Sequence, residues 1–109
     1  MLDQTGNTDK EYGAVLRVAR HLQRYGQFDR ALSLLDLADW LSPDGLEAGQ
    51  MRVDLLMALD RFEDALTEVF SRTGPEAIAP ATLARLYWQV GERDLGDETF
   101  RKSGIVPSD

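Results

Sequence analysis

Apolar side chains recur along this chain at the spacing of amphipathic helices. The first such stretch places them three and four positions apart, at Val15, Val18, Ala19 and Leu22. Gly26 permits the left-handed turn that ends a helix, and a second stretch with the same spacing starts at Phe28. That stretch stops before Pro43, because proline cannot continue a helix. Residues 12–44 are therefore expected to form a helical hairpin.

The hairpin pattern repeats after 34 residues, since Phe28-Asp29-Arg30-Ala31-Leu32 returns as Phe62-Glu63-Asp64-Ala65-Leu66. A weaker third copy, shortened by three residues, carries Leu83, Ala84, Tyr87, Gly91, Gly96 and Phe100. We therefore expect an all-α fold of six main helices in three antiparallel hairpins, at about 12–44, 46–76 and 77–103. A single domain would span 8–103, with 1–7 and 104–109 as tails. Thr8 and Glu11 would form a capping box at the first helix.

These positions resemble the tetratricopeptide repeat, in which small residues allow two helices to cross closely. The first unit matches its pattern at Val15, Val18, Ala19, Leu22, Gly26, Phe28, Ala31, Leu35, Ala38 and Pro43. The second unit departs from it, because Arg52 and Val53 stand at the Leu-Gly positions and Arg72 at the second small position. The resemblance covers about 12–103 and implies a right-handed solenoid of stacked hairpins.

In that family, partners usually lie in a concave groove lined by the first helix of each hairpin. The matching positions here are Leu16, Arg17, Arg20, Gln23, Arg24, Gln50, Met51, Asp54, Met57, Ile78, Ala81, Arg85, Trp88 and Gln89. The apolar members would anchor an amphipathic segment of a partner. The arginines at 17, 20 and 24 form either a basic rim for carboxylates or an ordinary solvated face. Trp88 either lines the groove or packs against the last helix, and Trp40 is either an exposed contact or packed under the following loop.

The composition and the motifs of the chain exclude several kinds of functional site. The 109 residues contain no cysteine and one histidine, His21, which excludes disulfides, thiol catalysis and histidine-rich metal sites. A net charge of −7 disfavours nucleic-acid binding. The sequence has no phosphate-binding glycine loop and no nucleophile elbow, so we expect neither an enzyme nor a bound cofactor or metal. It has no apolar run long enough to span a membrane and no evident signal peptide, which predicts a cytoplasmic protein without membrane insertion.

The resemblance also implies a function. The chain, three hairpins with almost nothing added, resembles the small tetratricopeptide-like chaperones of bacterial type III secretion, the YscY- and YscG-like families. The stretch Leu22–Leu35 and the following Leu41-Ser42-Pro43 are similar to the first repeat of the YscY-like members. Such a chaperone would bind one small amphipathic-helix secretion subunit in its groove and keep it soluble until export. The alternative is a non-catalytic adaptor or scaffold subunit of a larger complex. Both a homodimer and a heterodimer are compatible with the sequence.

Overall fold

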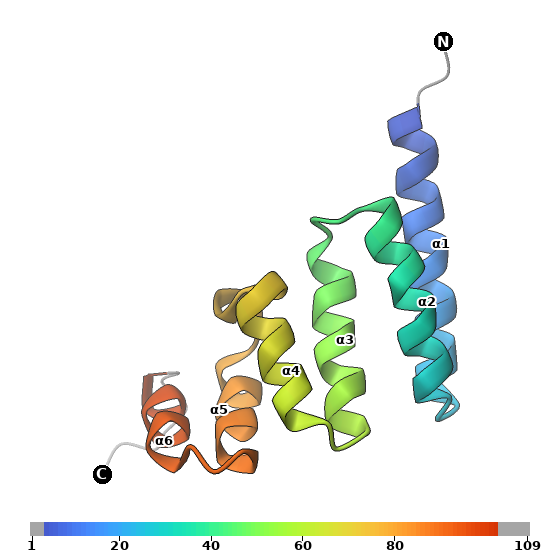
Figure 1. Ribbon diagram of the computed structural model, residues 1–109. Helices are drawn as coiled ribbons and strands as arrows, with labels where there is room; N and C mark the ends of the chain where they lie inside the picture. Colours follow the sequence, from blue (N-terminus) through green and yellow to red (C-terminus); the bar gives the residue numbers. More distant parts are fainter. Residues whose placement is uncertain (1–3, 103–109) are drawn as a thin grey trace.

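The computed structural model describes the backbone of residues 4–102 and the side chains of residues 9–102 (Figure 1). Within that range the chain forms six α-helices and no strand, which confirms the all-α prediction. The helices are α1 (Gln4–Arg24), α2 (Phe28–Leu41), α3 (Leu46–Ala58), α4 (Phe62–Glu68), α5 (Pro80–Gln89) and α6 (Arg93–Lys102). Two short helical segments, η1 (Val69–Thr73) and η2 (Pro75–Ala77), connect α4 to α5.

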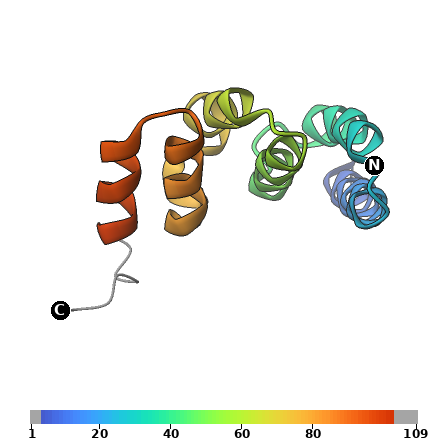
Figure 2. The same ribbon diagram turned by 90° about the horizontal axis from the view of Figure 1, so that it is seen from below.

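The helices pair in chain order. Helix α1 packs against α2, α3 against α4, and α5 against α6, while α2–α3 and α4–α5 contacts join successive pairs. Figure 2 shows α1, α3 and α5 in one row and α2 and α4 in a second row. The stack is elongated, with extents of 60 × 28 × 23 Å. Each pair therefore meets mainly its neighbours along the stack.

Helix α1 begins earlier than the sequence pattern predicts. Its first residue is Gln4, whereas a tail was expected over 1–7 and a capping box at Thr8 and Glu11. Both residues lie inside the helix, so the capping-box prediction is wrong. Residues 104–109, expected as the second tail, lie outside the described residues.

The apolar core consists of two clusters, and α3 contributes to both. The first joins α1, α2 and α3 through Leu16, Ala19, Ala31, Leu35, Ala38, Ala48, Met51 and Leu55. The second joins α3, α4, η1 and α5 through Val53, Leu56, Ala65, Val69, Ile78, Leu83 and Leu86. Ala31, Ala38 and Ala65 are fully buried, as expected where small side chains let two helices approach closely.

The start of α3 is capped by a side chain from α1. Gly45 precedes the helix and supplies no capping side chain. The Tyr12 hydroxyl instead accepts a hydrogen bond from the Ala48 N–H at 3.1 Å, which satisfies one of the free donors of the first turn. A Cβ at position 45 would overlap the Tyr12 ring, so this approach requires glycine. The cap fixes α3 against the first hairpin.

Helix α4 ends in a single wide turn. Its last residues continue as the π-helical segment η1, and Gly74 then reverses the chain with a φ of 92°. In a π-helix the residue five positions on lies above a given side chain. Thr73 accordingly donates a hydrogen bond to Glu68 at 3.2 Å. The wide turn therefore places the Thr73 hydroxyl at the end of η1 against the buried carboxylate of Glu68.

Candidate functional site

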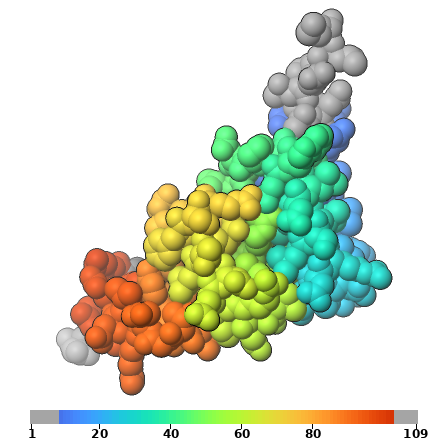
Figure 3. All heavy atoms as spheres, in the orientation of Figure 1, coloured from blue at the N-terminus to red at the C-terminus, as the bar shows by residue number. Residues whose placement is uncertain are grey.

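The surface of the α1, α3 and α5 row offers the candidate binding face, here called the inner face. The opposite surface, formed by α2 and α4, lies toward the viewer in Figure 3. Helix α3 is packed by α1, α2, α4 and η1, which leaves it a single open stripe. Its exposed residues Glu47, Gln50, Asp54 and Ala58 follow one another at helical spacing along that stripe.

Three arginines of α1 extend the inner face beside α3. Arg17, Arg20 and Arg24 are exposed and share one side of the helix, three and seven residues apart. Tyr12 contacts α3 from the adjoining side of α1, which places the arginine stripe next to α3. Among the described residues, the ion pairs involve Arg52, Arg61, Arg72 and Lys102 and none of these three arginines. The stripe therefore presents cationic groups that have no acidic partner within the part of the chain that the structure describes.

Helix α5 supplies the far end of the inner face. Arg85 and Gln89 are exposed and Ala81 is half-buried, as expected for groove positions. Trp88 packs against the last helix: its ring lies 5.7 Å from that of Phe100, and its indole N–H donates to an Asp97 carboxylate oxygen at 3.0 Å. The tryptophan remains 38% exposed. It therefore joins α5 to α6 and leaves about a third of its surface open to a partner.

Three apolar anchors expected in the groove belong instead to the core. Leu16, Met51 and Ile78 are only 2%, 5% and 8% exposed. Met57 is half-buried and packs against the second cluster. Helices α1 and α3 turn Leu16, Met51 and Met57 toward neighbouring helices, and Ile78 packs into the second cluster from the turn between η2 and α5. The inner face is thus predominantly polar and charged.

Two glutamine side chains predicted for the groove are partly engaged in contacts within the chain. The side-chain amide of Gln50 donates to the backbone carbonyl of Ala77 at 2.6 Å, which ties α3 to η2. Gln23 is half-buried near the end of α1. The exposed charged groups Arg17, Arg20, Arg24, Asp54 and Arg85 are therefore the predicted groove residues most available to a partner.

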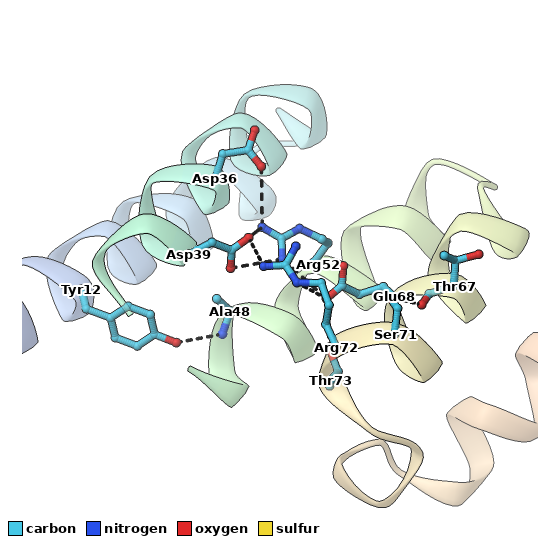
Figure 4. A network of polar contacts seen from close by, with 10 residues as sticks. All are labelled: Tyr12, Asp36, Asp39, Ala48, Arg52, Thr67, Glu68, Ser71, Arg72 and Thr73. Carbon is cyan, nitrogen blue, oxygen red and sulfur yellow. Dashed lines mark hydrogen bonds and ion pairs between the residues drawn. The ribbon is translucent and has the colours of Figure 1, made fainter. Parts of the chain in front are cut away.

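A cluster of charged side chains, with Arg52 and Glu68 buried at its centre, lies between the first two hairpins (Figure 4). Arg52 of α3 is 8% exposed, and its guanidinium lies 2.6 Å from Asp39 of α2 and 3.7 Å from Glu68 of α4. Arg72 of η1 reaches the same Asp39 oxygen at 2.7 Å. Asp36 approaches Arg52 from the solvent side at 3.8 Å. The cluster therefore connects α2, α3, α4 and η1 through charge-assisted contacts.

Both arginines of this cluster departed from the repeat pattern in the sequence, and the structure explains why. Arg52 and Arg72 both contact the same carboxylate oxygen of Asp39, so the two departures from the repeat pattern belong to one interaction. The hydrogen bond with Asp39 raises the pKa of Arg72 and outweighs the effect of its partial burial. Every buried side-chain nitrogen and oxygen of the described residues has a hydrogen-bond partner. The pocket of about 120 Å³ beside the cluster is lined by groups that already face one another, so we assign it a structural role.

Asp54 is the one carboxylate of the inner face with a shifted pKa. Partial burial raises this pKa above its ordinary value of 3.8, because desolvation disfavours the charged form. The folded state therefore binds this proton more tightly than the unfolded state does. Ionised Asp54 costs stability at neutral pH, and this cost disappears as the pH falls below 3.8.

Replacing Asp54 by asparagine should consequently stabilise the protein at neutral pH and should have no such effect below pH 3.8. Urea-unfolding midpoints of both proteins at the two pH values measure the difference. Asp44→Asn, in the exposed turn after α2, controls for the removal of one negative charge from a chain of net charge −7. An equal gain in both variants would contradict a desolvation effect specific to Asp54.

The described residues contain no group of three or more histidine, cysteine, aspartate or glutamate side chains placed to hold a metal ion. Over the same part of the chain, no helix is long and apolar enough to cross a membrane. Compared with known proteins, the chain matches no family model, no curated protein and no solved structure.

Proposed function

We propose that this chain is a small, non-catalytic protein-binding module of the tetratricopeptide type, which holds a helical segment of a partner along its inner face. The observation that carries the proposal is the arginine stripe of α1, which has no acidic partner among residues 9–102, beside the open stripe of α3. A helix laid in a groove is read through residues spaced three, four and seven apart. The arginines at 17, 20 and 24 have that spacing and cover about 10 Å of helix length.

The charges of the inner face indicate the chemistry of the partner. The arginines of α1 favour carboxylates, whereas Asp54 in the middle of the face favours a basic or hydrogen-bonding group. A base placed against Asp54 would also offset its desolvation. The preferred ligand is therefore an amphipathic helix with acidic residues along one edge and a base near its centre.

The more specific proposal is a chaperone for a small helical subunit of a bacterial type III secretion system. The resemblance of Leu22–Leu35 and Leu41-Ser42-Pro43 to the first repeat of those chaperones supports it. The mechanism would be burial: the inner face covers the surface through which the subunit would otherwise self-associate. Binding of this kind requires neither nucleotide nor metal.

Charge reversal on the inner face tests the binding proposal. The first step is to identify partners that co-purify with the chain from its host, and then to measure affinity with the purified partner. Arg17→Glu/Arg20→Glu should weaken binding about 10- to 100-fold, because two attractive contacts become repulsive. The matched control is Arg93→Glu/Arg101→Glu, which reverses two exposed arginines of α6. Equal weakening by both pairs would place the partner elsewhere.

Partner exchange separates the chaperone from the adaptor. A labelled, bound partner should be displaced by an excess of unlabelled partner if the chain releases its client. A partner that stays bound through repeated rounds of competition would instead identify the chain as a permanent scaffold subunit. Both outcomes retain the inner face as the binding surface, so this measurement is independent of the charge-reversal test.

A further inference from the structure

The outer flank of the first hairpin exposes an apolar stripe that the proposed binding mode does not use. On α1 and the turn after it, Glu11, Val18 and Tyr25 recur every seven residues and so share one side. Val18 is 51% exposed and Tyr25 is 71% exposed. Val18 is two residues from both the buried Leu16 and the exposed Arg20, which at 3.6 residues per turn places it on nearly the opposite side of α1 from each of them. Helices α1 and α2 form one end of the stack in Figures 1 and 2.

Helix α2 continues the same flank. Arg30, Leu34, Leu37 and Leu41 recur at helical spacing along one side of α2. The opposite side of α2 faces the second hairpin, since Leu32 contacts both core clusters and Asp39 binds Arg52. Leu37 is 45% exposed, and Leu34 is half-buried against the first cluster. Two adjacent helices therefore expose an apolar centre at one end of the stack.

The other end of the stack is built differently. Helix α6 carries exposed charged residues over most of its surface, namely Arg93, Asp94, Asp97, Glu98, Arg101 and Lys102. Stacked-hairpin proteins need a polar outer face at a terminal unit to remain soluble. Helix α6 meets this requirement and the first hairpin does not. A surface of this kind on a soluble chain marks an interface.

We propose that the outer flank of the first hairpin is a self-association surface, where two copies of the chain pack by two-fold symmetry with their α1 helices antiparallel. A two-fold interface must be complementary to itself. Glu11 lies at one end of the flank and Arg30 at the other, because α1 and α2 run antiparallel. The antiparallel arrangement brings each Glu11 toward Arg30 of the second copy, and Val18 and Leu37 meet at the centre.

The charges select this arrangement over the alternatives. A two-fold axis parallel to the helices would place Glu11 against Glu11 and Arg30 against Arg30, and like charges across an interface are repulsive. Head-to-tail stacking would press the apolar flank onto the charged surface of α6 and would form open-ended fibres rather than dimers. The flank runs for about 20 Å along two helices, which provides an area at the lower end of stable interfaces. The dimer is therefore expected to dissociate in the micromolar range.

Sedimentation of the purified chain over a range of concentrations tests the proposal. We expect a monomer–dimer equilibrium that Val18→Asp shifts to the monomer. Leu95→Asp on α6, where the leucine is 44% exposed, is the matched control and should leave the dimer intact. Helicity by circular dichroism should be the same in both variants, because each position is near half-exposed. A wild-type monomer at all concentrations, or equal loss of the dimer in both variants, would overturn the proposal.

A charge swap tests the pairing itself. Glu11→Arg or Arg30→Glu alone should weaken the dimer about tenfold, since each change affects two symmetry-related pairs. The double variant should restore the affinity of the wild-type chain. Failure of this rescue would rule out the antiparallel arrangement. Arg17→Glu/Arg20→Glu should not alter the dimer, so failure of the proposed partner binding and failure of this inference remain distinguishable.

Discussion

Replacing Arg52 by leucine is expected to lower the free energy of unfolding by about 3 kcal/mol. The change leaves Glu68, which is 7% exposed, with only the Thr73 hydroxyl and a distant Arg72 as partners. A buried carboxylate that has lost its counter-charge is costly, because the protein interior does not replace its hydration. Arg72 cannot take over, since it lies at the rim and already binds Asp39 at 2.7 Å. Urea denaturation followed by circular dichroism measures the loss.

The double variant Arg52→Leu/Glu68→Leu is the decisive control. It removes both Glu68 and its counter-charge Arg52 and leaves the Asp39–Arg72 pair in place. Replacing a buried ion pair by apolar residues is often neutral, so the double variant should regain most of the stability. If Arg52→Leu alone costs less than about 1 kcal/mol, the contacts are no stronger than surface ion pairs. If the double variant regains nothing, lost packing rather than the unpaired charge causes the destabilisation.

Two glycines inside helices should respond to alanine with opposite signs. A Cβ at Gly49 of α3 would overlap the Thr73 hydroxyl, which is buried and bonded to Glu68. Gly49→Ala should therefore destabilise the protein by about 1–3 kcal/mol through overpacking. At Gly13 of α1 the nearest atom is Arg17 Nη1 at 3.9 Å, so a methyl group fits. Gly13→Ala should stabilise by about 0.5–1 kcal/mol, because glycine is a poor residue in the middle of a helix.

Gly49→Ala and Gly13→Ala serve as controls for each other, because the chemical change is the same and only the surroundings of the added methyl group differ. Thermal and urea unfolding of both proteins give the two signs directly. A gain at position 49 would mean that α3 and η1 are not as close as the structure places them. A loss at position 13 would mean that this stretch of α1 has a partner that needs the glycine.

The repeat spacing in the sequence was enough to predict the helices and their order. Periodic apolar residues and the breaks at Gly26, Pro43 and Gly74 define the hairpins, because these signals are local. The buried alanines were also predictable, since small residues at matching positions indicate close helix crossings. The start of α1 was missed because residues 4–7 carry no apolar period.

The rotation of each helix about its own axis could not be read from periodicity. Leu16 and Val18 both have helical spacing to Ala19 or Leu22, and the sequence assigned Leu16 to the groove and Val18 to the core. The structure reverses the two: Leu16 is buried and Val18 is half-exposed. The choice depends on where α3 lies against α1, which is a tertiary property. The rotation of α3 likewise explains why Met51 was taken for a groove residue, whereas Ile78 was misplaced because it lies before α5 begins at Pro80.

In the sequence, the charged cluster appeared only as two arginines at positions where the repeat pattern has other residue types. Arg52 and Arg72 broke the repeat pattern, but their common partner Asp39 belongs to another hairpin and has no fixed spacing from either. A break in an otherwise regular repeat was thus the signal for a buried interaction. Its partners become evident only once α2, α3 and η1 are brought together.

Helix α6 differs from the other helices in a way that affects local opening. It packs mainly on α5, and Gly96 is its one buried residue among those described. Elements with few buried contacts open at lower free energy than the rest of a protein. Helix α3, with residues in both core clusters, stands at the opposite extreme. Among the helices that the structure describes, we therefore expect α6 to open most readily and α3 least readily.

The fluorescence of Trp88 is expected to report the opening of α6. Its indole is covered by Phe100 and bonded to Asp97, both on α6, so release of that helix changes the surroundings of the ring. The second tryptophan, Trp40, is 79% exposed and has little further exposure to gain when the chain opens. Tryptophan emission therefore follows the detachment of α6, while circular dichroism follows the loss of all the helices.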